Sequence, residues 1–197
     1  MRRLFAALAV LAFASPSAAL AASRNIADLP AGAYRLDKKH ASITAKVMHL
    51  GVSLYTLRFD AFDATFTYDP AHPEAAQVRA KVDTTSLDVG AAYGRRFADD
   101  FLEADKFPTM TFVSTAIRPG AEGKAGTMRG DLTLRGVTRP VTFDVTFGGV
   151  GKSLIFGTVT GFSATTTIKR SDFGSSAMRA FVGDDVRIEI EAEFDKT

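Results

Sequence analysis

The sequence predicts an all-β domain, an antiparallel barrel of about eight strands with one helix between strands three and four. Apolar and polar residues alternate with a period of two through most of the chain. This alternation places them on opposite faces of a strand. Only one segment has helical spacing, and no βαβ rhythm occurs, so we do not expect a parallel sheet.

The clearest predicted hairpin covers residues 128–147, MRGDLTLRGVTRPVTFDVTF. Leu132 and Leu134 alternate with polar residues before the turn, and Phe143 belongs to the matching series after it. Gly136 and Pro140 mark the turn between the two strands. Because proline cannot donate to a ladder, Pro140 is expected at the first residue of its strand or on an edge.

Before this hairpin, ordered structure is expected to begin near Tyr34, and alternation predicts strands over 42–50, 59–68 and 78–84. The parity of the alternation changes within 59–68. A β-bulge near Asp60 or Ala61 is the simplest explanation for that change.

The helix is predicted over 91–103, where Phe97, Phe101 and Leu102 recur at helical spacing before Phe107-Pro108 ends the segment. Alternation then returns over 109–117, and it continues after the hairpin over 154–168 and 186–194. Closing such a sheet into a barrel removes its edges, and a barrel of eight strands is filled by its own side chains or holds one small ligand. A two-sheet sandwich is the alternative, because periodicity alone does not distinguish them.

Residues 1–21 have the features of a cleaved secretory signal peptide. Arg2 and Arg3 precede an apolar run of about eleven residues, and Ala19-Leu20-Ala21 fits the small-x-small cleavage pattern. The run is shorter than the roughly 20 residues of a membrane span. We therefore expect a periplasmic mature chain from Ala22, with a linker over 22–33 and a barrel domain over 34–197. An uncleaved membrane anchor is the alternative.

Composition excludes several classes of protein. The chain has no cysteine, which removes thiol catalysis, iron–sulfur clusters and Cys-zinc sites and suits an exported protein without disulfides. Without Arg2 and Arg3, Lys+Arg falls from 24 to 22 against 22 Asp+Glu, so the mature chain is formally neutral. Net charge therefore argues against nucleic acid, or an anionic membrane surface, as the main partner.

Catalytic and metal-binding constellations are missing from the sequence. His40 and His49 are nine positions apart, on opposite faces of a regular strand, and His72 lies in a proline-flanked turn, so we predict no metal site. No nucleophile elbow, HExxH, complete P-loop or GxGxxG motif occurs, and no catalytic residue is assigned. The 16 phenylalanines, set beside Gly, Ala and Thr on alternating strands, suit an apolar interior with spare volume. A fully packed core is the alternative.

A set of motifs spans the predicted domain: Tyr34-x-Leu36-Asp37-x-x-His40-x-x-Ile43, His49-x-Gly51, Phe62-Asp63-Ala64-Thr65-Phe66, Ser86-Leu87-Asp88, Lys106-Phe107-Pro108-x-Met110-x-Phe112, the run from Gly130 to Val141, and Arg170-Ser171-Asp172-Phe173-Gly174. Through them the chain resembles the YceI-like family, also called polyisoprenoid-binding periplasmic proteins, from Tyr34 to Phe194. It departs from that family at Phe101, where a histidine often stands.

The resemblance implies an extended, lipocalin-like barrel that binds a long isoprenoid chain, such as a polyprenyl lipid or a quinone tail, in its interior. Because no catalytic constellation is found, we expect no enzymatic activity. No cofactor is expected to be required, and a bound isoprenoid lipid or quinone is left open. Strand parity suggests a set of ligand-lining residues without saying which face is inward: Val47, Phe66, Val82, Phe112, Leu132, Phe143, Phe156 and Ile188.

A second set of residues is expected at the mouth or in turns as hydrogen-bonding groups, with contact to a ligand head group as the alternative role: Asp37, His40, His49, Arg170 and Asp172. Two other functions stay open, an enzyme acting on a lipid or quinone at the barrel mouth and a stress-related interaction protein with a filled barrel. The expected partner is an isoprenoid lipid, with no nucleic acid and no membrane span, and a homodimer is left open.

Overall fold

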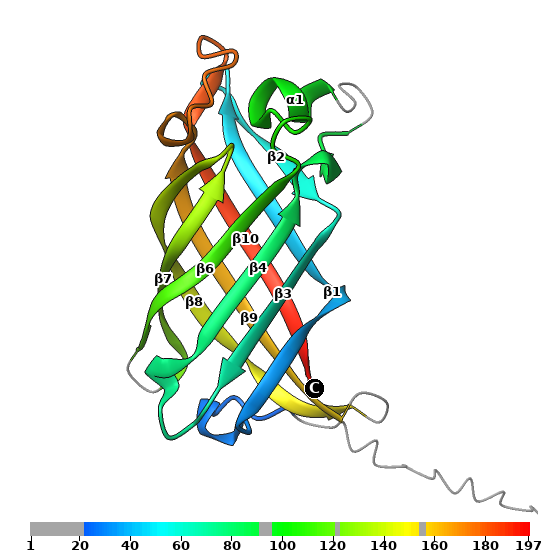
Figure 1. Ribbon diagram of the computed structural model, residues 1–197. Coiled ribbons are helices and arrows are strands. Elements are labelled where there is room, and N and C mark those ends of the chain that lie inside the picture. Colours follow the sequence, from blue (N-terminus) through cyan, green and yellow to red (C-terminus); the bar gives the residue numbers. More distant parts are fainter. Residues whose placement is uncertain (1–21, 91–95, 121–122, 154–156) are drawn as a thin grey trace, which may run out of the picture.

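The chain forms a closed antiparallel β-barrel (Figure 1). The structure, a computed structural model, describes residues 22–90, 96–120, 123–153 and 157–197. The strands in these ranges are β1 (Gly32–His49), β2 (Ser53–Phe59), β3 (Phe62–Tyr68), β4 (Gln77–Asp83), β5 (Leu87–Asp88), β6 (Thr109–Pro119), β7 (Ala125–Leu134), β8 (Val137–Ser153), β9 (Gly157–Lys169) and β10 (Val182–Lys196). The helices are α1 (Arg96–Leu102) and the short 3₁₀ segments η1 (Ile26–Asp28), η2 (Pro73–Ala75), η3 (Thr84–Ser86) and η5 (Arg170–Phe173).

Eight of the described strands make the ring, in the order β1, β3, β4, β6, β7, β8, β9 and β10, and the pairing of β10 with β1 closes it. This confirms the predicted barrel of about eight strands and excludes the sandwich. The start of β1, Gly32 to Arg35, pairs with β3, whereas its second half, Ile43 to His49, pairs with β2. β1 therefore changes its neighbour partway along the barrel, and β2 with the short β5 extends the wall at that end.

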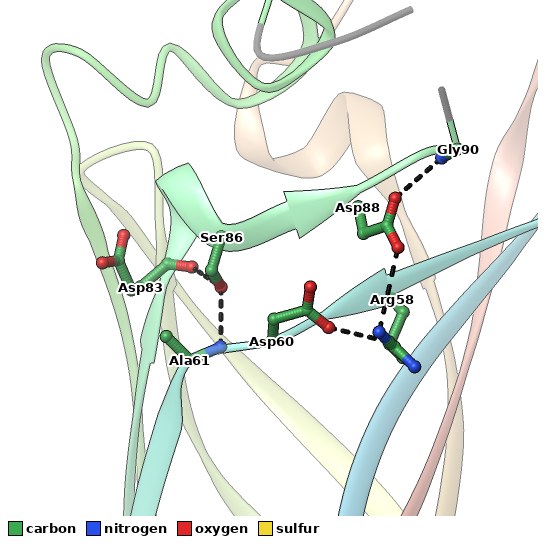
Figure 2. Close-up of polar contacts among 7 residues, drawn as sticks. All are labelled: Arg58, Asp60, Ala61, Asp83, Ser86, Asp88 and Gly90. Atoms are coloured by element: carbon green, nitrogen blue, oxygen red, sulfur yellow. Dashed lines mark hydrogen bonds and ion pairs between the residues drawn. The ribbon is translucent and has the colours of Figure 1, made fainter. Parts of the chain in front are cut away.

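The predicted bulge at Asp60 or Ala61 is wrong, because the chain breaks there into two separate strands, β2 and β3. Figure 2 shows the hydrogen bonds and ion pairs that hold the break between β2 and β3 against the Ser86-Leu87-Asp88 motif. The backbone N–H of Ala61 donates to Ser86 Oγ (3.0 Å), and Ser86 Oγ donates to Asp83 O (2.7 Å). The motif thus satisfies backbone groups that the ladder leaves unpaired.

Arg58 adds ion pairs to the same junction. Its Nε lies 2.7 Å from Asp60, and its Nη2 lies 3.8 Å from Asp88 (Figure 2). The predicted strand over 59–68 corresponds to β3, and β2 was not predicted. In the structure α1 lies after β4 and the short β5 and before β6, between the third and fourth strands of the ring, as in the prediction.

The segment 22–33 is packed against the barrel, which corrects its expected role as a linker. Ser23 pairs with Val150 on the free edge of β8, and the η1 segment follows. Leu29 is only 1% exposed, in a cluster with Tyr34 and Phe66. An apolar anchor of this kind stabilises the packing of the segment that was expected to be a linker.

Two glycines of the predicted hairpin are required by close packing. A Cβ on Gly130 would lie 2.3 Å from the ring of Phe112, so only glycine lets that ring lie against β7. Gly136 has φ 72° and, with Arg135 at φ 54°, forms the two-residue turn between β7 and β8. The turn predicted near Gly136 is therefore confirmed, and Pro140 lies inside β8, opposite Asp131 of β7.

Candidate functional site

The barrel encloses an elongated cavity of about 470 Å³, a volume typical of small-molecule sites. Inward-facing side chains of every strand of the ring line it, together with residues of α1. The inward residues near the middle of the barrel, such as Ala80, Met110 and Ile188, are only partly buried, because they face this cavity instead of other side chains.

The cavity opens to solvent at the lower end of the barrel in Figure 1, where the β3–β4 and β6–β7 turns lie. Its lining residues there, Pro70, Pro119 and Ala125, are exposed. At the upper end the lining residues Leu134 and Val182 are buried. One end of the cavity is therefore open and the other is closed.

The wall is almost entirely apolar and is rich in aromatic rings. Phe66 packs edge-on against Phe194 (4.9 Å between centroids), and Phe112 packs edge-on against Phe143 (5.3 Å). Four described residues of the wall are charged. Arg118, Lys124 and Arg170 lie at the ends of the cavity, and Asp63 lies on β3 beyond the last residue that pairs with β1. A long apolar chain is the ligand that such a wall accommodates, because burying polar groups against it without partners is costly.

The structure decides which strand face is inward. Seven of the residues proposed from parity line the cavity: Val47, Phe66, Val82, Phe112, Leu132, Phe143 and Ile188. The eighth, Phe156, lies outside the described residues. Their contact with a ligand stays a prediction.

Arg170 is buried at the closed end, where it orders the loop before β10. Its Nε donates to Gly183 O (2.8 Å), and its two Nη atoms donate to Ala177 O (2.8 Å) and Val182 O (2.9 Å). Burial lowers the pKa of the guanidinium, but arginine stays protonated at physiological pH. Three of the five N–H groups of Arg170 thus donate to carbonyls of this loop and of the start of β10, and contact with a ligand head group stays a prediction.

The α1 helix covers the closed end beside Arg170. The guanidinium of Arg170 lies 5.6 Å from the ring of Phe101, which stacks on Phe97 at 4.2 Å. Arg135 donates to Phe101 O (2.9 Å) and contacts Glu103. The family resemblance marked Phe101 as the place where a histidine often stands, and here that position is an apolar part of the cavity wall.

Asp37 and His40 lie outside the cavity, on the outer wall. Residues 37–40 of β1 oppose the single residue Glu193 of β10, so the strand bulges outward there. His40 Nδ1 lies 2.8 Å from Asp37 Oδ2 and 3.9 Å from Glu193 Oε2. The hydrogen bond with Asp37 raises the pKa of His40, and that with His40 lowers the pKa of Asp37.

These three side chains are the one group in the described ranges whose ligand atoms lie close enough to share a cation, within 4.8 Å of one another. The group is largely exposed, and exposed acidic groups of this kind are common without a metal ion. His49 lies at the exposed end of β1 opposite Val182, and Asp172 is exposed on η5. Neither side chain lines the cavity, so this placement offers no support for a head-group role inside the barrel.

The predicted set of ligand-lining residues names no alanine. Ala45, Ala64, Ala80, Ala164 and Ala192 all line the cavity, and their small side chains leave space inside the wall. They share strand parity with the larger lining residues and fit the spare volume expected beside the phenylalanines. The sequence did not single out these five, because an alanine on an apolar face does not by itself distinguish empty space from a tightly packed neighbour.

Known proteins match this chain over most of its length. The family model of the YceI-like domain matches residues 34–194. A UPF0312 protein of Pseudomonas putida (strain W619) is 41% identical over 179 residues, 88% of each chain. A UPF0312 protein of Vibrio cholerae is 40% identical over 162 residues, 80% of this chain and 85% of that one.

Solved structures show the same fold. BcnA of Burkholderia cenocepacia has a TM-score of 0.72 and 26% identity, covering 80% of this chain and 98% of that chain. The YCEI protein of Campylobacter jejuni has a TM-score of 0.66 and 28% identity, covering 77% and 91%. A polyisoprenoid binding domain from Saccharophagus degradans has a TM-score of 0.62 at 14% identity, covering 83% and 98%, and shows the fold alone.

Proposed function

Because the chain belongs to the YceI-like family, we propose that it binds a long isoprenoid chain, a polyprenyl lipid or a quinone tail, inside the barrel cavity and carries it in the periplasm. The observation that supports this most directly is the elongated apolar cavity with one open end. A chain enters such a cavity tail first and leaves its polar head at the opening. A polyisoprenoid binding domain of Saccharophagus degradans shares the fold.

The energetics suit this class of ligand. Burial of each methylene-sized group contributes about 0.8 kcal/mol, so each five-carbon isoprene unit contributes roughly 4 kcal/mol before the entropy cost of ordering the chain. A few buried units are then enough for micromolar binding, about 8 kcal/mol, without any polar anchor. The branched chain also packs against the rings of Phe66, Phe112 and Phe143, which line the wall.

The two other functions have less support. A cavity of about 470 Å³ counts against a barrel filled by its own side chains. An enzyme would need a titratable group free to act at the cavity. His40, His49 and His72, all within the described ranges, lie away from its lining, and Asp63, the acidic side chain among the described lining residues, is ion-paired with Lys38 (2.8 Å). We therefore favour a binding protein over a catalyst.

Native mass spectrometry of the protein purified from its own host, followed by solvent extraction, tests the proposal. The expected result is a bound mass that dissociates as a prenyl lipid or a quinone. Delipidated protein is then titrated with a fluorescent polyprenol and, for comparison, with a fluorescent fatty acid of similar carbon number. Extracts without prenyl lipid, together with no saturable binding of polyprenol, would refute the function.

A further inference from the structure

The upper end of the barrel carries a continuous apolar surface that the lipid cavity does not use. The large apolar side chains that are exposed in the described part of the chain all lie in two segments. The β1–β2 hairpin carries Met48, Leu50, Val52 and Leu54, and the loop before β10 carries Met178 and Phe181. We call these six side chains the apical patch.

The two segments of the apical patch touch. The N–H of Leu50 donates to Phe181 O (2.7 Å), and His49 pairs with Val182 across β1 and β10. A Cβ placed on Gly183 would lie 3.1 Å from Met48 Cβ. Figure 1 shows both segments at the end of the barrel away from the β3–β4 and β6–β7 turns. The six side chains therefore form one surface, and Val52 at its tip is 82% exposed.

The turn between β1 and β2 gives no conformational reason for a leucine at its tip. Leu50 and Gly51 have φ 54° and 70°, and Val52 N–H donates to His49 O (3.0 Å), which is the pattern of a type I′ turn. The first central position of that turn favours Asn, Asp or Gly, and leucine is strained there. Leu50 occupies it with 55% of its surface exposed.

The turn between β7 and β8, which also has positive φ at its two central residues, shows the contrast. Between β7 and β8 the same position holds Arg135, at φ 54°, and that side chain donates to Phe101 O. A structural contact therefore accounts for the strained residue in one turn, whereas the strained leucine in the other turn projects into solvent. The difference indicates that Leu50 serves a contact outside the folded chain.

We propose that the apical patch docks the protein on a phospholipid bilayer by inserting these side chains into the interface. Residues 47–57 and 173–183 contain no acidic residue, so an anionic bilayer would not repel them, and Arg179 supplies a cation beside Met178 and Phe181. The flanking Asp184 is turned back toward η5, where it accepts bonds from Ser171 N (2.9 Å) and Ser171 Oγ (2.7 Å).

The shape of the patch also favours a bilayer over a second copy of the chain. Six partly exposed side chains present roughly 600 Å² of apolar surface, near the size of the largest patches on ordinary monomers. Two projecting tips cannot bury all of that area against each other, and a stable dimer needs about 800 Å² per partner. A fluid interface, in contrast, closes around a projecting tip. The neutral net charge of the mature chain fits docking that depends on apolar insertion more than on charge.

Docking by this end leaves the open end of the cavity accessible from solution. Val47 and Val182 line the closed end of the cavity, next to Met48 and Phe181 in the patch. The apical patch lies on the outside of the barrel and the cavity on its inside. Membrane docking and lipid binding can therefore each be measured without the other.

Flotation with vesicles tests the proposal, using the chain from residue 22 to 197 so that the apolar run in residues 1–21 is not present. Vesicles of phosphatidylcholine alone are compared with vesicles that also contain phosphatidylglycerol. We expect binding to both, and at least a tenfold lower partition coefficient for the Leu50→Asn, Val52→Ser double variant. This variant should fold as well as the parent, because asparagine suits the turn. Ala71→Asn, in the exposed β3–β4 turn, is the matched control and should bind like the parent.

Arg179→Ala should weaken binding to the anionic vesicles by about fivefold and leave the neutral ones nearly unchanged. Sedimentation of the same proteins measures self-association. No binding of the parent to either vesicle, equal binding of the double variant, or a dimer that only the double variant loses would each overturn the proposal. Retention of polyprenol by the double variant in detergent shows that the cavity is intact, so failure of docking is distinguishable from failure of the proposed function.

Discussion

Filling the cavity from a wall alanine should stabilise the unliganded protein and weaken lipid binding together. Ala80 lies on β4 between Ala64 of β3 and Phe112 of β6, and it faces the cavity. Replacing it with leucine adds three carbon atoms to this inward face. The substitution removes no wall contact, unlike a phenylalanine deletion, so the effect on binding is not confused with loss of the fold.

The magnitude follows from the space beside Ala80. Three added carbons gain about 2.4 kcal/mol of transfer free energy if they become fully buried, and about 1–2 kcal/mol in a cavity that is open at one end. In a filled barrel the same carbons would overpack the core and cost about 1–3 kcal/mol. The sign of the change in unfolding free energy therefore distinguishes an open cavity from a filled one. Displacing even two carbons of a bound chain loses about 1.6 kcal/mol, more than tenfold in affinity.

Urea unfolding of delipidated protein, followed by circular dichroism, measures the first effect, and titration with a fluorescent polyprenol measures the second. Ala116→Leu is the matched control, since Ala116 is exposed on β6 opposite Arg129. It should change stability by less than about 0.5 kcal/mol and leave binding unchanged. A destabilised Ala80→Leu protein with undiminished lipid affinity would refute the reasoning.

Three further predictions concern packing, the closed end and the outer wall. Gly130→Ala should lower the unfolding free energy by about 1–3 kcal/mol in urea titrations, because its Cβ would displace the ring of Phe112; an unchanged midpoint would contradict this packing. Arg170→Met should cost about 3–5 kcal/mol, since three carbonyls lose a charged donor, and faster proteolysis within 175–183 should accompany the loss; a stable variant that fails only in lipid binding would instead support a head-group role. The hydrogen bond with Asp37 raises the pKa of His40, so the stabilisation of the fold by this pair is fully present below the unfolded-state pKa of His40 near 6.5 and is lost as pH rises through its folded-state pKa. The pKa of Asp37 is lowered, so the same stabilisation is also lost in acid, as pH falls through the folded-state pKa of Asp37. The difference in Tm between the parent and His40→Gln should therefore be largest at about pH 5–6 and should shrink toward pH 9, and a constant difference would argue against the pair.

Much of the fold could be predicted from local pattern. Alternation with a period of two located most of the strand regions, and parity separated the two faces of each strand, with Val47, Phe112 and Ile188 each on the face proposed to line a cavity. Such predictions succeed because side-chain direction along a strand is a local property. The break between β2 and β3 was mistaken for a bulge, because both features change parity in the same way.

The polar residues were harder to place. Arg170 and His40 occupy comparable family motifs, yet Arg170 lies buried at the closed end of the cavity and His40 lies outside the barrel. The partners of Arg170 are carbonyls of Ala177, Val182 and Gly183, which a bend of the chain brings back to it. No periodicity in the sequence encodes such a bend. Expected roles for turn residues were therefore less specific than those for strand residues.

What the sequence determined by itself was an antiparallel β domain with one apolar face per strand, together with the family motifs that it carries. Only the tertiary structure decided which face turns inward, how β10 closes against β1, that small side chains such as Ala80 leave a cavity, and that the exposed apolar residues meet at one end. The reason is physical. Parity depends on neighbouring residues, whereas closure, spare volume and surface patches depend on pairings between distant segments and on the sum of side-chain volumes that those pairings enclose.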